Sequence, residues 1–145
     1  MNGRVWRIQW LGLSEKKMSE DTGGILRPLV AVGAALAGLS VVLGAFGAHA
    51  LKSHLNAEAL GWWQTAVQYL MWHALAVLVL GLVGARWARL PALLLAGGAL
   101  LFSGTLYLIA LGAPRWLGAV TPVGGVAMIA GWALLAWRGA RQSWS

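Results

Sequence analysis

The chain has 145 residues, of which 59% are hydrophobic and only 10% are charged. A soluble domain carries about 25% charged residues, so this composition excludes an ordinary soluble protein. The formal net charge of +7 does not indicate nucleic-acid binding, because Lys and Arg lie between long apolar runs, where they act as topology signals and contact anionic lipid. The absence of cysteine excludes disulfides, thiolate metal sites and cysteine nucleophiles.

Residues 1–24 form a basic segment that we expect to be disordered or to lie in the membrane interface. Its apolar run is too short and too interrupted for a secretory signal. Two interpretations of residues 1–17 remain open. They form a basic amphipathic helix at the membrane surface, or Met18 is the functional start and they are dispensable.

Residues 25–145 are predicted to form one transmembrane domain with four apolar spans, at about 29–49, 64–83, 91–111 and 121–137. A span of about 20 residues is roughly 30 Å long as a helix, which matches the hydrocarbon thickness of a bilayer. Thr121 and Pro122 are expected to be the N-cap and first residue of the fourth helix. Short connections make consecutive helices antiparallel neighbours, so we predict an all-α, integral-membrane, antiparallel four-helix bundle.

The positive charges predict the orientation of this bundle. Nine of the eleven Lys and Arg residues belong to the N-terminal segment, the loop with Arg86 and Arg89, or the C-terminal tail. Lys52 and Arg115 are alone in the other two loops. Positive residues stay in the cytoplasm, so both termini are expected there. Tryptophans near the span ends, which we expect to lie in the interfaces, agree with these boundaries: Trp62, Trp63 and Trp116 outside, Trp87 and Trp137 inside.

Small residues repeat every three or four positions along the spans, which predicts close packing between helices. The alternative is a close backbone approach to a ligand. The predicted packing positions are Gly33, Ala37, Gly44, Ala48, Gly97, Gly104, Gly124 and Gly131.

Polar side chains inside the spans are the candidate functional residues. His73 is an ionisable group well inside a span, and such a group is a functional candidate by default. Counted from the outer span ends, Ser40, His73 and Ser103 each lie about 12 to 14 Å deep, and Tyr69 and Tyr107 about 6 to 8 Å. We therefore predict a polar cluster in which His73 faces Ser40, Ser103, a tyrosine or a trapped water. The alternative to a functional role is a neutral histidine that is purely structural and whose hydrogen bonds are satisfied by neighbouring helices.

Two chemical alternatives remain open. A haem- or quinone-linked redox subunit could use His49 and His73, but His49 ends its span while His73 lies about 14 Å deep, and two axial ligands must sit at similar heights. A small transporter or channel subunit could use a path past His73. Coupled transport normally needs a membrane carboxylate, and none of the four acidic residues lies in a span.

Several motifs, in the same order, resemble the YgdD-type family of small four-helix inner-membrane proteins, a domain of unknown function with eukaryotic relatives. The segments are 44–51 (GAFGAHAL), 63–66 (WQTA), 73–76 (HALA), 102–107 (FSGTLY) and 121–125 (TPVGG), with Tyr69, Gly131 and Trp132. Thr105 stands where the family suggests Ser, and Met128 where it suggests an aromatic residue. The resemblance covers about residues 29–137. It implies a bacterial inner-membrane location and supplies no activity, substrate or cofactor.

The sequence thus predicts a non-enzymatic membrane protein without a cofactor or metal. Small-residue faces and the lack of a catalytic constellation favour action through lipid contacts or as an accessory component of a larger membrane complex. Expected partners are membrane lipids, and both a homo-oligomer and a larger complex remain open; nucleic acid is not expected.

Overall fold

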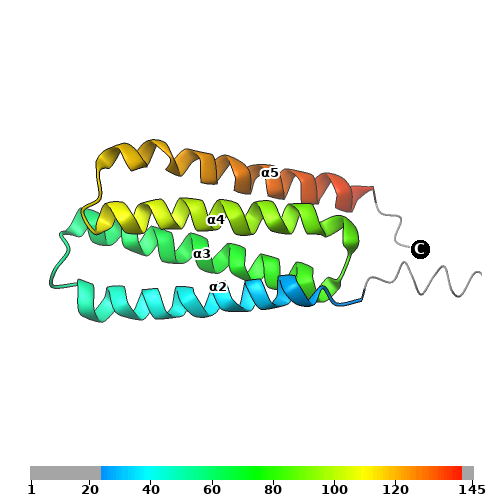
Figure 1. Cartoon of the computed structure of the whole chain (residues 1–145), viewed down its shortest axis with the longest axis horizontal. Coiled ribbons are helices and arrows are strands. Elements are labelled where there is room, and N and C mark those ends of the chain that lie inside the picture. The colour runs from blue at the N-terminus through cyan, green and yellow to red at the C-terminus, as the bar shows by residue number, and fades with distance from the viewer. Residues whose placement is uncertain (1–23, 142–145) are drawn as a thin grey trace, which may run out of the picture.

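The computed structural model describes residues 24–141, which form four long helices and three short helical segments (Figure 1). The segments are α2 (Arg27–Phe46), the π-helical η1 (Gly47–Leu51), α3 (Ala57–Val83), the 3-10 segment η2 (Arg86–Ala88), α4 (Arg89–Ala110), the 3-10 segment η3 (Arg115–Ala119) and α5 (Thr121–Ala140). Four helical runs of 23 to 27 residues are long and apolar enough to cross a membrane. The predicted all-α membrane fold with four transmembrane helices is confirmed.

The helices lie side by side in chain order, so the bundle is open. α2 packs on α3, α3 on α4 and α4 on α5, whereas α2 and α5 do not pack along their lengths (Figure 1). The buried core therefore lies mainly on α3 and α4, where Leu70, Val77 and Leu95 are almost fully buried. Many large apolar side chains on α2 and α5 stay exposed, as expected for surfaces that face lipid.

The second helix begins at Ala57, seven residues before the predicted span at 64. The side chain of Asn56 accepts a hydrogen bond from the Ala59 N–H at 2.8 Å and caps the helix. Glu58 in the first turn adds a negative charge, which the positive end of the helix dipole favours. The predicted depths on this helix assume a start at Gln64, and the earlier start increases each of them by about 10 Å.

The fourth helix also differs from the prediction at its start. Thr121 is the first helical residue rather than a cap, and its hydroxyl lies 2.8 Å from the Thr105 hydroxyl on α4. The Thr121 side chain thus connects two helices instead of capping one. α5 continues to Ala140, three residues beyond the predicted end at 137.

Three of the predicted small residues lie where two helices touch. A Cβ added to Gly33 would come within 3 Å of the Leu78 and Ala74 backbone on α3. Gly124 on α5 is equally close to the Phe102 and Gly98 backbone on α4. Gly131 lies against the Leu95 side chain, so close approach at these glycines lets the backbones pack directly.

Of the other predicted packing positions, some face a neighbouring helix and others do not. Ala37 packs against the core cluster, and Gly44 lies beside Val67. Gly97 and Gly104 have no described atom within 4 Å of an added Cβ, because they lie on a face of α4 that meets neither α3 nor α5. Ala48 is exposed, and the preceding Gly47 faces α3 instead.

Two glycines outside the predicted packing positions approach a neighbouring helix closely. An added Cβ on Gly81 would lie 2.7 Å from the Val30 nitrogen, and one on Gly98 would lie 2.8 Å from the Gly124 oxygen. Both lie in apolar stretches that contain other small residues. Which of these small residues faces the neighbouring helix depends on how the helices are rotated relative to each other. The predictions for residues 1–23, including the role of Met18, fall outside the described residues.

Candidate functional site

His73 lies on α3 with its ring turned toward the inside of the bundle. The residue is 7% exposed. Its Nδ1 lies 2.7 Å from the Tyr69 backbone oxygen, one turn earlier on the same helix. Its Nε2 accepts a hydrogen bond of 3.2 Å from the Trp132 indole N–H on α5. Because Nε2 accepts, this network assigns the proton of a neutral imidazole to Nδ1, which donates to the Tyr69 carbonyl.

The two predicted serines hold neighbouring helices to the middle of α3. Ser40 Oγ on α2 donates to the Val67 carbonyl at 2.8 Å, and Ser103 Oγ on α4 donates to the Ala66 carbonyl at 2.9 Å. Each carbonyl oxygen has a second lone pair beyond the one used within the helix. Both serines are buried, so these bonds satisfy hydroxyls that would otherwise be unpaired in hydrocarbon.

The structure does not bring His73 into one layer with these serines. The serines contact α3 at residues 66 and 67, and His73 lies six to seven residues further along, about 10 Å deeper at 1.5 Å per residue. The predicted common height depended on a helix that began at Gln64. The actual start at Ala57 accounts for a shift of the same size.

Tyr69 and Tyr107 belong to two different aromatic groups. The Tyr69 ring lies 4.6 Å from Phe102 and stacks on His73 at 6.0 Å between centroids. Tyr107 meets Trp63 edge to face at 4.6 Å. The buried Tyr107 hydroxyl has no hydrogen-bond partner within residues 24–141. Tyr69 therefore belongs to the His73 site, and Tyr107 to the packing near the other end of α3.

Trp63 is a core residue, and its level relative to the membrane interface stays a prediction. Its side chain is 3% exposed, and its indole N–H donates to the Leu43 carbonyl on α2 at 2.9 Å. Gly47, at the start of the π-helical turn, lies against the same indole. An inserted side chain is a usual cause of such a local departure from α-helix geometry. Trp62 remains half-buried, and Trp116 and Trp137 are exposed.

Sequence reasoning missed Trp132 as a site residue. Its indole N–H supplies the hydrogen bond to His73 that the prediction assigned to serine, tyrosine or water. The signal available in the sequence was the Gly131–Trp132 pair in the family motif. Gly131 lets α5 approach Leu95 on α4, and the adjacent large side chain can then reach α3 across the open bundle.

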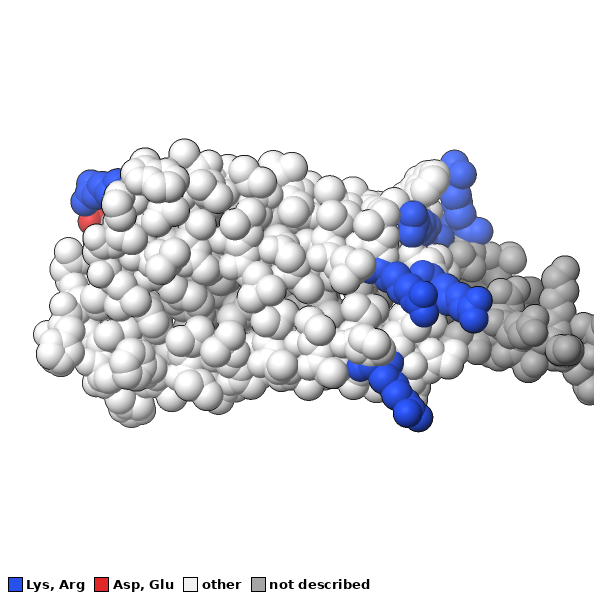
Figure 2. Space-filling model, in the orientation of Figure 1, with Lys and Arg blue, Asp and Glu red and all other residues white. Residues whose placement is uncertain are grey.

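The charged residues gather at the two ends of the molecule, with an apolar band between them (Figure 2). Gly24 and Arg141 lie at the same end (Figure 1). Within residues 24–141 this end carries five arginines: Arg27 at the start of α2, Arg86 and Arg89 between α3 and α4, and Arg138 and Arg141 at the end of α5. Arg138 donates to the Trp87 carbonyl at 2.7 Å, and the Arg141 guanidinium lies 4.3 Å over the Trp137 ring. We call this end the arginine end.

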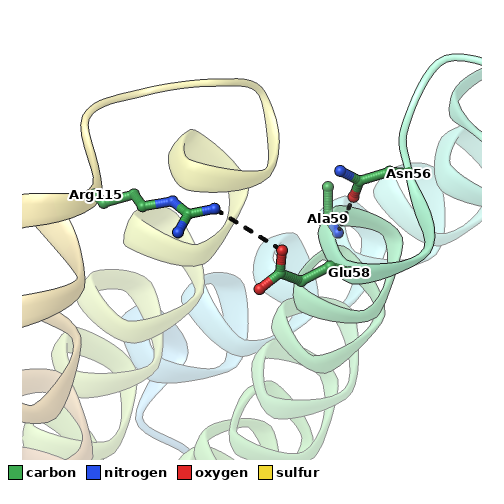
Figure 3. Close-up of polar contacts among 4 residues, drawn as sticks. All are labelled: Asn56, Glu58, Ala59 and Arg115. Atoms are coloured by element: carbon green, nitrogen blue, oxygen red, sulfur yellow. Dashed lines mark hydrogen bonds and ion pairs between the residues drawn. The ribbon is translucent and has the colours of Figure 1, made fainter.

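The opposite end carries Lys52 and Arg115. Arg115 lies 3.9 Å from Glu58, and both side chains are well exposed, so this ion pair contributes little to stability (Figure 3). Beside Arg115 a mostly apolar cavity of about 430 Å³ lies among α3, α4 and α5, lined by residues that include Trp62 and Phe102. A second cavity, of about 490 Å³, lies at the arginine end.

No group of three or more His, Cys, Asp or Glu side chains within residues 24–141 is arranged to hold a metal ion. The hydrogen bonds of Ser40, Ser103 and His73 each join groups of the same chain.

Comparison with known proteins places this architecture in a family. The family described as "Protein of unknown function (DUF423)" matches residues 43–125. The chain is 46% identical over 107 residues to the UPF0382 inner membrane protein YgdD of Escherichia coli K12, covering 70% of this chain and 82% of that protein. It is 39% identical over 116 residues to a UPF0382 membrane protein of Staphylococcus haemolyticus, covering 76% and 93%. No solved structure matches. The chain therefore belongs to the DUF423 family of small YgdD-like membrane proteins, as its motifs implied.

Proposed function

We propose that this protein is a non-enzymatic component of the bacterial inner membrane that acts through contacts with lipids or as an accessory component of a larger membrane complex. The observation that carries the proposal is the use of the intramembrane polar groups. Ser40, Ser103 and His73 each make one hydrogen bond to a neighbouring helix. The cavities of about 430 and 490 Å³ lie instead at the ends of the bundle and open to the surface next to arginines.

The same proposal places both termini in the cytoplasm. The arginine end contains Gly24 and Arg141, and the positive-inside rule assigns such an end to the cytoplasmic face (Figure 2). The YgdD relative is named an inner membrane protein, which supports the location.

The open bundle supports a role in assembly. The faces of α2 and α5 that meet no other helix in residues 24–141 carry large exposed apolar residues, among them Val41, Val42, Val126 and Ile129. Helices of a second copy or of another membrane protein can pack on such faces, since association in lipid depends on close contact between side chains rather than on hydrophobicity.

The transport and redox alternatives find less support. A haem ligand needs a free imidazole nitrogen, and both ring nitrogens of His73 are engaged by Tyr69 and Trp132. A path past His73 would have to break the hydrogen bond to Trp132 on α5.

The test is to extract the tagged full-length chain in membrane nanodiscs and to identify proteins and lipids by mass spectrometry. An unrelated four-helix membrane protein with the same tag serves as the control. We expect a protein in fixed stoichiometry, or a lipid class enriched over the bulk membrane. A Soret band in the purified sample would contradict the proposal. So would solute or proton flux in liposomes that His73→Leu abolishes.

A further inference from the structure

A cavity of about 490 Å³ at the arginine end is lined by three arginines, Arg27, Arg86 and Arg89. They come from two segments that are far apart in the sequence. Arg27 opens α2, whereas Arg86 and Arg89 lie in the turn that joins α3 to α4. The space-filling view shows arginine side chains gathered at this end of the molecule (Figure 2).

Backbone contacts hold these two segments together. The Leu26 N–H donates to the Gly81 carbonyl at 2.8 Å and so fastens the start of α2 to the end of α3. Gly84 ends α3 with a φ of 73°, a left-handed conformation that favours glycine, and turns the chain toward Arg86. The position of the arginines is therefore built by the fold and does not depend on their side chains.

The positive charge of this cavity is not neutralised within the described part of the chain. Glu58 is the one Asp or Glu in residues 24–141, and it lies at the opposite end beside Arg115. No hydrogen bond or ion pair joins Arg27, Arg86 or Arg89 to another side chain in that range, whereas Arg138 and Arg141 at the same end have contacts. Three neighbouring cations that have no acidic side chain beside them in residues 24–141 favour an anionic ligand.

Phosphate is the anion that suits this arrangement. A guanidinium group offers several N–H donors in a planar fork, which matches the geometry of phosphate oxygens. The positive dipole ends of α2 and α4 also lie here, because both helices start beside the cavity, and they outnumber the one negative end, that of α3 at Gly84.

Apolar side chains next to the lining residues point to a lipid rather than to a soluble phosphate. Ile25 lines the cavity and is 58% exposed, while Val83 and Leu90 adjoin it in sequence and are 60% and 46% exposed. A phospholipid would place its headgroup on the arginines and its acyl chains along such side chains. Basic pockets at the cytoplasmic ends of transmembrane helices bind anionic headgroups in this way.

We infer that the cavity formed by Arg27, Arg86 and Arg89 binds the phosphate headgroup of an anionic phospholipid. This inference rests on the proposed role in lipid contact and names one site for it. Zwitterionic phospholipid binds here more weakly, because its own cation is repelled by the three arginines.

The experiment measures the unfolding temperature of the purified full-length protein in neutral detergent during titration with phosphatidylglycerol. Parallel titrations use phosphatidylcholine and inorganic phosphate. The variants are Arg89→Gln, the double variant R86Q/R89Q and the charge-preserving R86K/R89K. Arg141→Gln is the matched control, because it removes one positive charge at the same end but outside the cavity.

Phosphatidylglycerol should raise the unfolding temperature of the wild type and of Arg141→Gln equally. Arg89→Gln should weaken the apparent affinity about tenfold, because the loss of one charge-assisted hydrogen bond weakens binding by about this factor. R86Q/R89Q should abolish the shift in unfolding temperature. R86K/R89K should lie between them, because lysine keeps the charge and loses the planar fork.

Four results would overturn the inference. They are no shift in the wild type, an equal shift with phosphatidylcholine, an equal loss in Arg141→Gln, and a full shift with inorganic phosphate alone, which would indicate a soluble phosphate ligand. If the site fails but lipids or a protein still co-purify with R86Q/R89Q, the proposed function stands without this site. If nothing co-purifies with the wild type although the titration succeeds, the proposed function fails and the site stands.

Discussion

Gly97 and Gly98 are neighbours on α4 with opposite surroundings, and they provide a direct test of helix packing. A Cβ on Gly98 would lie 2.8 Å from the Gly124 backbone oxygen, whereas one on Gly97 meets no described atom within 4 Å. We expect Gly98→Ala to destabilise the protein by about 1 to 3 kcal/mol, because backbone must move. Gly97→Ala should be neutral or stabilising by up to about 1 kcal/mol, because alanine is the better helix former.

Thermal unfolding in detergent measures both glycine variants under the same conditions. Equal stability of Gly98→Ala and Gly97→Ala would mean that α4 and α5 do not approach each other as described.

His73 and Trp132 should be energetically coupled through their hydrogen bond. Trp132→Phe leaves the Nε2 acceptor unpaired in the membrane, and His73→Leu leaves the indole N–H without its acceptor. The double variant removes both the donor and the acceptor, so neither is left unpaired. Its loss of stability should therefore be smaller than the sum of the two single losses. The expected coupling is about 0.6 to 2 kcal/mol, the range for interhelical hydrogen bonds in lipid. His73→Asp should be more damaging than His73→Leu, because it buries a carboxyl group.

Reversible unfolding in a mixed-micelle titration supplies the four free energies of this cycle. Additive losses would show that the His73–Trp132 hydrogen bond contributes nothing to stability.

At the scale of elements, the contact between the π-helical η1 and α3 depends on one small residue. An added Cβ on Gly47 would lie 2.5 Å from the Trp63 indole, whose N–H donates to the Leu43 carbonyl. Gly47→Ala should therefore lower the unfolding temperature, because the indole must leave its hydrogen bond or α2 must move away. Gly61→Ala is the control, since Gly61 lies on α3 with no described atom near an added Cβ. An unfolding temperature unchanged by Gly47→Ala would show that Trp63 can rearrange freely.

At the scale of the whole molecule, the even number of helices and the charge at each end predict the orientation. A reporter that is active only in the periplasm should give no signal when fused after Arg141 and a strong signal when inserted near Asn56. These two positions lie at opposite ends of the bundle (Figure 1). The physical reason is the retention of positive residues on the cytoplasmic side. The reverse pattern of signals would contradict the assignment of the arginine end to the cytoplasm.

Composition and periodicity were enough to predict the number of helices and their antiparallel order. A bilayer demands about 20 apolar residues in each span, and short loops leave little choice of neighbour. The spacing of small residues likewise pointed to Gly33, Gly124 and Gly131, where backbones do approach each other. Family motifs carried the resemblance that the comparisons confirm. Each of these features belongs to a single segment of the chain, so it can be read from the sequence without knowledge of the tertiary contacts.

Tertiary structure decided which side chains meet. Ser40 and Ser103 meet α3 at the carbonyls of Val67 and Ala66, six to seven residues before His73, so His73 lies about 10 Å from their level. The partner of His73 is Trp132 on α5, which no periodicity on α3 could identify. Arg27 joins Arg86 and Arg89 because the Leu26 N–H bonds to the Gly81 carbonyl. A hydrophobic pattern specifies how far a helix extends and which face is polar, but the rotation and depth of each helix against its neighbours come from contacts between residues distant in the chain.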